Sequence, residues 1–313
     1  MLNRSCIPTT FHLKGLSGLE NIYGWVSVPL CFMFFVSIMG NGVILYVIHR
    51  DHKLHQPMFL LLTTLAITDI LFSLSTSPSV LSIFLFHHHN IRSQLCLLQM
   101  CFIQLLSISE SSLLAAMAYD RYVAICHPLR YTAILTNSAV AKAILVSGLR
   151  GTLFLPAIIS LQFLPYCKGN VLSHSYCLHQ DVMKLACDGS NTFNIVYGFA
   201  TILGTTSVDI VFIVITYILI IKVVSHVASK MEQYKLFNTC VSHLCAVFMF
   251  YIPMMALSVV HRFHVKAPSG FTNFISNSYI FVPPMINPII YSIKNRQIRE
   301  SFRETFHLRK IIW

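Results

Sequence analysis

Apolar residues along this 313-residue chain gather into long runs separated by short polar segments. Each run approaches or exceeds the ~20 residues that an α-helix needs to cross the hydrocarbon of a bilayer. Because the backbone cannot hydrogen-bond to water there, we expect each run to be a helix. The predicted spans cover approximately residues 25–48, 58–83, 96–119, 141–164, 194–221, 238–260 and 273–293.

Composition supports a membrane protein. Hydrophobic residues make up 55% of the chain and charged residues only 11%, whereas soluble domains carry about 25% charged residues. We therefore predict an all-α membrane protein with one seven-transmembrane helix bundle in residues 25–293. An extracellular N-terminus (1–24) precedes it and a cytoplasmic tail (294–313) follows it.

The tail has a helical pattern of its own. Ile298, Phe302 and Phe306 recur every four residues, with basic residues between them. This spacing predicts a short amphipathic helix that lies on the inner leaflet, so membrane lipids are expected partners.

Charge predicts the orientation. The net charge is +11, and most Lys and Arg residues fall after spans one, three and five and in the tail. The positive-inside rule then places the N-terminus outside and the C-terminus in the cytosol of a multi-pass plasma membrane protein. Residues 1–24 lack an apolar core, so we expect no cleaved signal. Asn3-Arg4-Ser5 is a glycosylation acceptor that fits an outside N-terminus.

Four of the 10 cysteines, Cys96, Cys167, Cys177 and Cys187, fall on the predicted outer side, where disulfides form. They allow three pairings and leave Cys6 over. Two bridges would hold the long connection between spans four and five as a lid. The adjacent histidines 87–89 favour a polar loop over a metal site.

Several motifs, in matching order and spacing, resemble the odorant receptors, which are rhodopsin-like G-protein-coupled receptors. They are Gly40-Asn41, Leu54-His55-Gln56-Pro57-Met58-Phe59, Asp69, the run from Met117 to Leu129 with Asp120-Arg121-Tyr122, Lys235-x-Phe237-x-Thr239-Cys240-x-Ser242-His243, and Pro284-x-x-Asn287-Pro288-x-x-Tyr291. The segments 175–181 and 258–263 further resemble the class I, or fish-like, branch. One departure is Thr216-Tyr217, where the family usually has Ser-Tyr.

The resemblance implies a receptor that is not an enzyme. It would bind a small-molecule odorant and activate a heterotrimeric G protein of the stimulatory olfactory type. No nucleic acid partner is expected, and no cofactor beyond a structural sodium ion. We expect a Cys96–Cys177 disulfide, with Cys167 and Cys187 as a candidate second pair. The expected coupling and switch residues are Asp120, Arg121, Tyr122, Tyr217, Asn287, Pro288 and Tyr291.

Ser258 and Arg262 are four residues apart, so they share one face of a helix. The guanidinium of Arg262 is suited to a carboxylate, and Gln180 would hang above it from the lid. The alternative is a salt bridge from Arg262 to Asp181. Gln104 stands where acid-sensing relatives can carry histidine, so a neutral odorant or a non-nasal metabolite stays an alternative ligand. The remaining expected wall residues are Ile103, Ser107, Ile108, Thr201, Thr205, Tyr251, Met254 and Leu257.

Ionisable residues inside spans are costly and indicate function. Asp69 and Glu110 predict either a sodium site, helped by Asn287 and Ser107, or two protonated acids that are hydrogen-bonded. Arg150 in span four is open: it snorkels, pairs with an acid at the lipid side or in a loop, or faces the bundle.

Other membrane functions fit less well. A transporter typically shows inverted repeats, but the chain has no visible repeat and seven spans do not divide in two. A membrane enzyme would need a catalytic motif such as His-x-x-Glu-His or Gly-x-Ser-x-Gly, and no span contains one.

Overall fold

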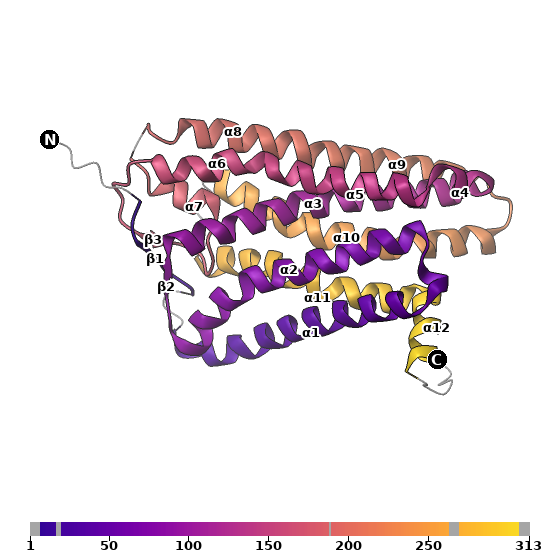
Figure 1. Ribbon diagram of the computed structural model, residues 1–313, viewed down its shortest axis with the longest axis horizontal. Helices are drawn as coiled ribbons and strands as arrows, with labels where there is room; N and C mark the ends of the chain where they lie inside the picture. Colours follow the sequence, from indigo (N-terminus) through magenta and orange to yellow (C-terminus); the bar gives the residue numbers. More distant parts are fainter. Residues whose placement is uncertain (1–6, 17–19, 188, 263–268, 307–313) are drawn as a thin grey trace.

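Long helices running side by side dominate the computed structural model, which describes residues 7–16, 20–187, 189–262 and 269–306 (Figure 1). Three spans are continuous at the start: α1 (Tyr23–Arg50), α2 (Pro57–Phe86) and α3 (Ser93–Cys126). The last two are α10 (Lys230–Arg262) and α11 (Ser269–Lys294). The prediction of a seven-helix bundle is confirmed. Within the bundle, α3 packs against α2, against α10, and against the helices α5 (Asn137–Gly151) and α9 (Val208–Ser225) of spans four and five.

Spans four and five change helical form along their length. The fourth consists of α5 (Asn137–Gly151), η4 (Thr152–Phe154), α6 (Leu155–Ser160) and η5 (Leu161–Phe163). The fifth consists of α8 (Thr192–Ile202), the wider π-turn η6 (Leu203–Ser207) and α9 (Val208–Ser225). Shorter helical turns connect the spans, namely η1 (Glu20–Ile22), η2 (His52–Leu54), η3 (Pro128–Arg130), α4 (Tyr131–Ile134) and α7 (His179–Lys184).

Apolar and polar residues are arranged as a bilayer requires. Within the described residues, six of the spans are long and apolar enough to cross a membrane. The seventh, α11, carries more polar residues and packs between α1, α2 and α10. Large apolar side chains such as Phe32 and Phe35 are exposed on the outside, whereas Asn41 and Asp69 are buried. The outer surface thus suits lipid, and these polar groups are kept out of it.

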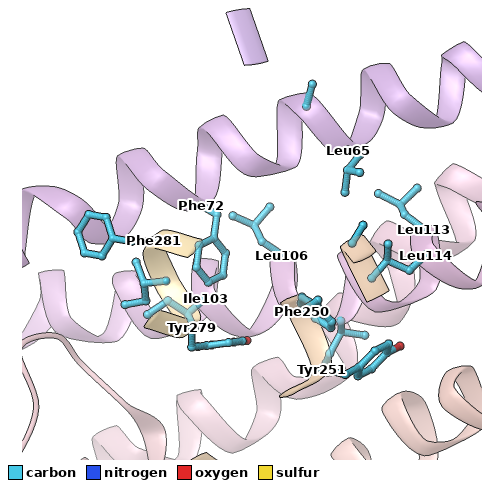
Figure 2. Close-up of a cluster of buried hydrophobic side chains, with 14 of the residues drawn as sticks. Leu65, Phe72, Ile103, Leu106, Leu113, Leu114, Phe250, Tyr251, Tyr279 and Phe281 are labelled. Atoms are coloured by element: carbon cyan, nitrogen blue, oxygen red, sulfur yellow. The ribbon is translucent and has the colours of Figure 1, made fainter. Parts of the chain in front are cut away.

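The bundle interior also holds a layer of apolar and aromatic side chains (Figure 2). Phe72 of α2 meets Tyr279 of α11 edge-on, with ring centroids 5.9 Å apart. Phe250 and Tyr251 of α10 form a second perpendicular pair at 5.0 Å.

A small sheet covers one end of the bundle, on the side of the N-terminus in Figure 1. Its strands are β1 (Thr10–Leu13), β2 (Asn90–Arg92) and β3 (Val171–Leu172), in the order β2-β1-β3. β1 pairs antiparallel with β2 and parallel with β3. The sheet is absent from the all-α prediction, because strands this short have no pattern of their own and form only through long-range pairing. We call this end the lid end, and residues 164–191 the lid.

The opposite end, the tail end, carries the predicted amphipathic helix, α12 (Arg296–Thr305). The side chain of Asn295 caps it by accepting from the backbone N–H groups of Gln297 and Ile298. Ile298 is buried against the bundle. The Ser301 hydroxyl donates to the Asp51 carboxylate beyond α1, and this hydrogen bond lowers the pKa of Asp51.

Two glycines permit close helix contacts. A Cβ at Gly40 of α1 would lie 2.9 Å from Cγ of Pro288 in α11. A Cβ at Gly151 of α5 would lie 2.6 Å from the backbone oxygen of Leu105 in α3. The second contact brings the neighbouring Arg150 close to α3.

Candidate functional site

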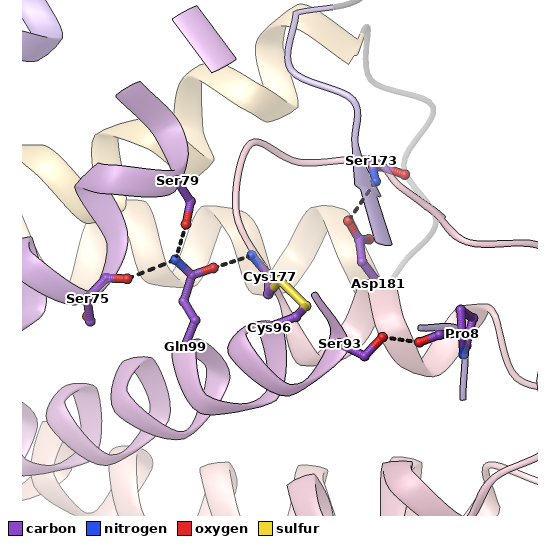
Figure 3. The surroundings of a disulfide bond; sticks show 9 residues. All are labelled: Pro8, Ser75, Ser79, Ser93, Cys96, Gln99, Ser173, Cys177 and Asp181. Atoms are coloured by element: carbon purple, nitrogen blue, oxygen red, sulfur yellow. Dashed lines mark hydrogen bonds between the residues drawn. A yellow bond between two sulfur atoms is a disulfide. The ribbon is translucent and has the colours of Figure 1, made fainter. Parts of the chain in front are cut away.

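Two disulfides hold the lid over the bundle. Cys96 at the start of α3 pairs with Cys177, and Cys167 pairs with Cys187 within the lid. These are the two pairs that the sequence analysis favoured, and Cys6 lies outside the described residues. Gln99 strengthens the first attachment: its side-chain oxygen accepts from the backbone N–H of Cys177 at 2.9 Å, and its amide nitrogen donates to α2 (Figure 3).

Beneath the lid lies a cavity of about 60 Å³ between α3, α7, α8, α10 and α11. Eight predicted pocket residues line it: Ile103, Gln104, Ser107, Ile108, Gln180, Met254, Leu257 and Ser258. Four further residues that the sequence reasoning missed complete the wall: Leu178, Ile202, Thr206 and Tyr279. Tyr279 was hard to predict because its place depends on how α11 packs, where its hydroxyl shares a hydrogen bond with Ser107.

Three predicted wall residues do not line this cavity. The Thr205 hydroxyl donates to the backbone oxygen of Thr201 in its own helix, and Tyr251 points into the polar cluster of Arg150 described below. The side chain of Arg262 lies outside the described residues. Asp181, its alternative partner, is in hydrogen-bond contact with Nδ1 of His174 and lies 3.9 Å from the Lys184 amine.

A second cavity of about 350 Å³ adjoins the first, between α7, α8 and η4. Phe154, Met183 and Phe199 supply much of its wall, and Gln180, Ile202 and Ser258 belong to both cavities. His179 is buried in this wall, where its Nε2 lies 3.0 Å from the side-chain oxygen of Asn194. Burial lowers the pKa of His179. The sequence pattern did not predict this cavity, because its walls come from the irregular lid and the broken fourth span.

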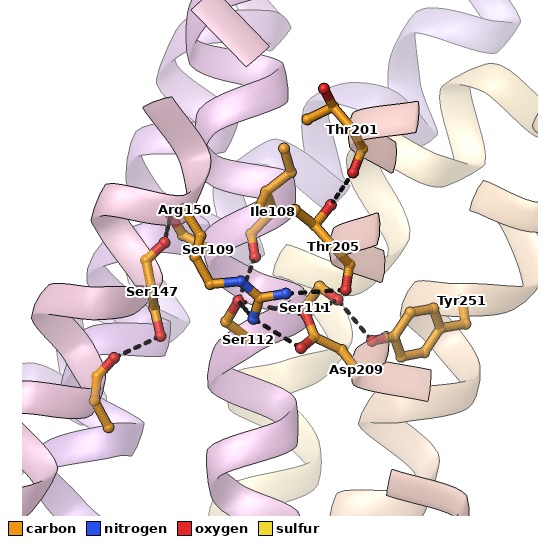
Figure 4. Close-up of polar contacts among 11 residues, drawn as sticks. Ile108, Ser109, Ser111, Ser112, Ser147, Arg150, Thr201, Thr205, Asp209 and Tyr251 are labelled. Carbon is orange, nitrogen blue, oxygen red and sulfur yellow. Dashed lines mark hydrogen bonds and ion pairs between the residues drawn. The ribbon is translucent and has the colours of Figure 1, made fainter. Parts of the chain in front are cut away.

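Arg150 faces the interior of the bundle, which settles its three alternatives (Figure 4). Its Nη1 lies 2.8 Å from the Asp209 carboxylate and 2.6 Å from the Ser112 hydroxyl. Its Nη2 donates to the backbone oxygen of Thr205 at 2.9 Å, within the π-turn η6. The Ser111 hydroxyl donates to Asp209 and shares a second hydrogen bond with Tyr251, both at 2.8 Å.

This cluster therefore joins four spans: α5, α3, the fifth span and α10. Sequence reasoning missed Asp209, which is the only acidic residue in the apolar run 194–221. An acid in that setting needs a partner of opposite charge. The same rule points to Arg150 as that partner, because it is the basic residue inside a neighbouring span.

Asp69 and Glu110 form a second buried cluster, at the level of Asn287. The Asn287 amide nitrogen donates to Asp69 at 3.0 Å. One oxygen of each of these three side chains is buried and has no hydrogen-bond partner among the described residues. Ser107, expected to help here, bonds to Tyr279 instead. No group of three or more His, Cys, Asp or Glu residues in the described part could hold a metal ion.

A cavity of about 360 Å³ opens at the tail end. Predicted switch residues Asp120, Arg121 and Tyr291 line it together with Tyr131 and His243. The Arg121 guanidinium lies 2.9 Å from the Asp120 carboxylate. The Tyr131 hydroxyl donates to the same carboxylate at 2.7 Å, and burial together with that negative charge raises the pKa of Tyr131.

The other predicted switch residues lie around this cavity. Tyr217 shares a 2.7 Å hydrogen bond with His243 of α10. Tyr122 stacks on Tyr119. Pro288 packs against Gly40, and Asn287 contacts Asp69 as described. The structure thus brings Asp120, Arg121 and Tyr291 together and places Asn287 deeper in the bundle.

A seven-helix bundle with a disulfide-attached lid over the cavities at one end and an Asp-Arg pair at the other end is the architecture of rhodopsin-like receptors. The crystal structure of squid rhodopsin has the same fold, with a TM-score of 0.71 at 17% identity, covering 92% of this chain and 81% of that one. The olfactory receptor family model matches residues 30–309. Human olfactory receptor 51A4 is 48% identical over 313 residues, covering 99% of each chain. Human olfactory receptor 51G2 is 46% identical over 303 residues, covering 96% of each.

The chain therefore belongs to the olfactory receptor family. Membership makes it a multi-pass plasma membrane receptor rather than an enzyme. Its partners are a small-molecule ligand and a G protein.

Proposed function

We propose that this receptor binds a small carboxylic acid beneath the lid and activates a stimulatory G protein, which raises cyclic AMP. The observation that carries the ligand site is the cavity bounded by Gln180 of the lid and Ser258 of α10. The helix α10 continues through position 262, one turn beyond Ser258. Arg262 therefore follows Ser258 on the same helix face, where a guanidinium could pair with the ligand carboxylate.

The signalling half of the proposal rests on the tail-end cavity. Arg121 is held by Asp120, and Tyr217 by His243. Outward movement of α10, which contains Pro253, would separate Tyr217 from His243 and enlarge this cavity for a G protein. A ligand drives this change only by binding the open state more tightly than the closed one.

We further propose a sodium ion between Asp69 and Glu110. The three partnerless oxygens of Asp69, Glu110 and Asn287 are hard donors that suit such an ion. A bound cation would offset the mutual repulsion of the two carboxylates. The alternative is that one or both acids are protonated, with buried water completing their hydrogen bonds.

The proposed orientation places the lid end outside the cell and the tail end in the cytosol. Two disulfides at the lid end support it, because disulfides form in oxidising compartments. Asn3, expected to carry a glycan, lies outside the described residues. A loss of mass on glycosidase treatment that Asn3→Gln abolishes would establish this orientation.

The ligand proposal is tested by cyclic AMP responses to matched aliphatic acids, alcohols and esters. Wild type, Arg262→Ala, Arg262→Lys and the control Arg92→Ala, which changes a lid-end cation outside both cavities, would be compared at equal surface expression. We expect acids to activate wild type and Arg92→Ala, to fail on Arg262→Ala, and to act weakly on Arg262→Lys, since lysine keeps the charge and loses the fork.

Equal activation of wild type and Arg262→Ala by neutral odorants would favour the alternative, a receptor for an uncharged ligand. Ligand responses through another class of G protein, with cyclic AMP unchanged, would reject the stimulatory type and leave the ligand site standing.

A further inference from the structure

A separate cavity lies at the tail end, where α1, α2 and α5 meet. Its volume is about 320 Å³, which is within the ~300–1,000 Å³ of typical small-molecule sites. Its walls come from the end of α1, the connecting loop 51–56, the start of α2 and Asn137, the first residue of α5. We call it the side cavity. Gln56 lines both the side cavity and the tail-end cavity that contains Arg121.

The side cavity lies at the depth where the hydrocarbon gives way to the lipid head groups. His49 belongs to the last turn of α1, whereas Leu60 and Thr63 belong to the first two turns of α2. Leu60 is exposed at the surface of the bundle. Because an apolar side chain exposed on a membrane span is covered by lipid, the side cavity borders the bilayer rather than the bundle axis.

The lining changes from apolar to polar along α1 toward the tail end. Leu45 and Ile48 are followed by His49, and His55 of the connecting loop lies beyond them. Asn137 adds an amide from α5. A molecule with an apolar body and a polar end, aligned with the lipids, therefore fits this order of side chains.

Several polar groups of the lining are available to a ligand. In the described part of the chain, the side chains of His49, Thr63 and Asn137 make no hydrogen bond. The ring of His55 meets only the edge of His52, with the centroids 5.0 Å apart. An imidazole and an amide can each donate to an oxygen acceptor. The polar side of the cavity thus offers donors to an incoming head group.

Charge selects the kind of head group. None of the described lining residues is acidic. Arg50 and Lys53 are exposed beside the cavity, and the Lys53 amine lies 3.9 Å from the Glu304 carboxylate. Asp51, the only acid of the connecting loop, accepts from the Ser301 hydroxyl and from the backbone N–H of Lys53. The complementary occupant is an anion, and basic residues at a membrane edge attract anionic phospholipids.

We propose that the side cavity binds one anionic phospholipid, with its phosphate at His49, His55 and Asn137 and its chains along Leu45 and Leu60. This gives a role to Leu54 and His55, which open the motif 54–59 and belong to neither the ligand cavities nor the tail-end cavity. The inference rests on the proposed orientation only in making this leaflet the inner one, where anionic lipids concentrate.

The test uses purified full-length receptor without odorant or G protein, so its failure and the failure of the proposed function are separate results. A photoactivatable phosphatidylserine is cross-linked to the receptor in phosphatidylcholine nanodiscs, and the labelled peptides are identified. We expect the label in peptides that cover residues 45–63. Titration with phosphatidylserine, followed by native mass spectrometry, gives the affinity, and phosphatidylcholine should bind more weakly.

Two pairs of variants locate the site. His49→Ala removes a donor and should weaken phosphatidylserine binding about ten-fold, as expected for a hydrogen bond to a charged group. His226→Ala is its control, since it changes an exposed histidine of the tail end outside both cavities there. Thr63→Leu fills part of the cavity without changing any charge and should also weaken binding. Thr132→Leu makes the same change at an exposed position of α4 outside both cavities and should follow wild type.

Cross-links spread evenly over the tail end would overturn the proposal, as would equal affinities of His49→Ala and His226→Ala. Displacement of the lipid by inorganic phosphate would show a site for a free anion, and displacement by cholesterol but not by phosphatidylcholine would show a sterol site. Either result would reject an anionic phospholipid. If Thr63→Leu does not fold, His49→Ala decides, because His49 is exposed and makes no hydrogen bond within the described residues.

Discussion

Two clusters of buried charge lie inside this bundle, and they are built in opposite ways. Arg150 and Asp209 carry opposite charges 2.8 Å apart, and the surrounding hydroxyls and a backbone oxygen complete their hydrogen bonds. Asp69 and Glu110 are both acids, and each keeps a buried oxygen without a partner among the described residues.

The difference indicates different roles. A charge in the hydrocarbon is tolerated when a counter-charge and hydrogen bonds replace water. The Arg150 cluster meets that condition within the protein, so it ties four spans together without help. The Asp69 cluster meets it only when a cation, a proton or water is added. One cluster is thus a structural joint, and the other is where an outside species can act on the bundle.

The largest effect is expected from Arg150→Met, which leaves Asp209 buried without its counter-charge. Breaking a buried pair in this way costs about 3–5 kcal/mol. We expect a large fall in surface expression and in the Tm of purified receptor. Adding Asp209→Leu should restore much of the loss, because a buried pair replaced by apolar residues is often neutral.

Lys142→Met is the control for that comparison, since it removes an exposed cation from the same helix. A loss of equal size in Lys142→Met would show that net charge rather than pairing is responsible.

A smaller effect is expected from Gly151→Ala, which disturbs the Arg150 cluster by overpacking the contact between α5 and α3. The new Cβ would lie 2.6 Å from the Leu105 backbone oxygen, so α5 must move away from α3 and carry Arg150 with it. Overpacking of this kind costs about 1–3 kcal/mol. Thermal unfolding measures it beside Gly148→Ala, whose Cβ would meet nothing within 4 Å. Equal stability of the two variants would contradict the close contact.

The same substitution can be made in both clusters: Asp209→Asn in the Arg150 cluster and Asp69→Asn in the Asp69 cluster. We expect Asp209→Asn to destabilise the receptor strongly, because Arg150 loses its counter-charge. Asp69→Asn removes one of two like charges, so in sodium-free buffer its free energy of unfolding should stay within about 1 kcal/mol of wild type. Wild type should gain Tm in sodium chloride over matched choline chloride, and Asp69→Asn should not. An equal wild-type Tm in sodium chloride and in choline chloride would reject the ion site.

The smallest effect is expected from Tyr251→Phe, which removes one hydroxyl at the edge of the first cluster. Ser111 keeps its bond to Asp209, so only a single interhelical hydrogen bond is lost. Such bonds contribute about 0.6 kcal/mol on average in membrane proteins. Thermal unfolding should show a small fall in Tm, and a loss as large as that of Arg150→Met would place Tyr251 at the centre of the joint.

Much of the architecture could be read from the sequence because it depends on local composition. Each apolar run is long enough to span, and in lipid a span must be helical. The four-residue spacing of Ile298 and Phe302 predicted α12, since this too is a pattern within one short segment. Ser258 and Gln180 were placed at one cavity by resemblance, and the structure puts both there.

Only the tertiary structure decided which distant groups meet. The partner of Arg150, the sheet at the lid end and the larger cavity under the lid all depend on segments that are far apart in the chain. Gly151 illustrates the reason: its role is to let α5 approach Leu105 of α3, and no local pattern records that contact. The sequence by itself determined the seven helices, because each helix satisfies its own backbone. Which charges pair and where the cavities form depends on how the helices pack, because several helices contribute the side chains involved.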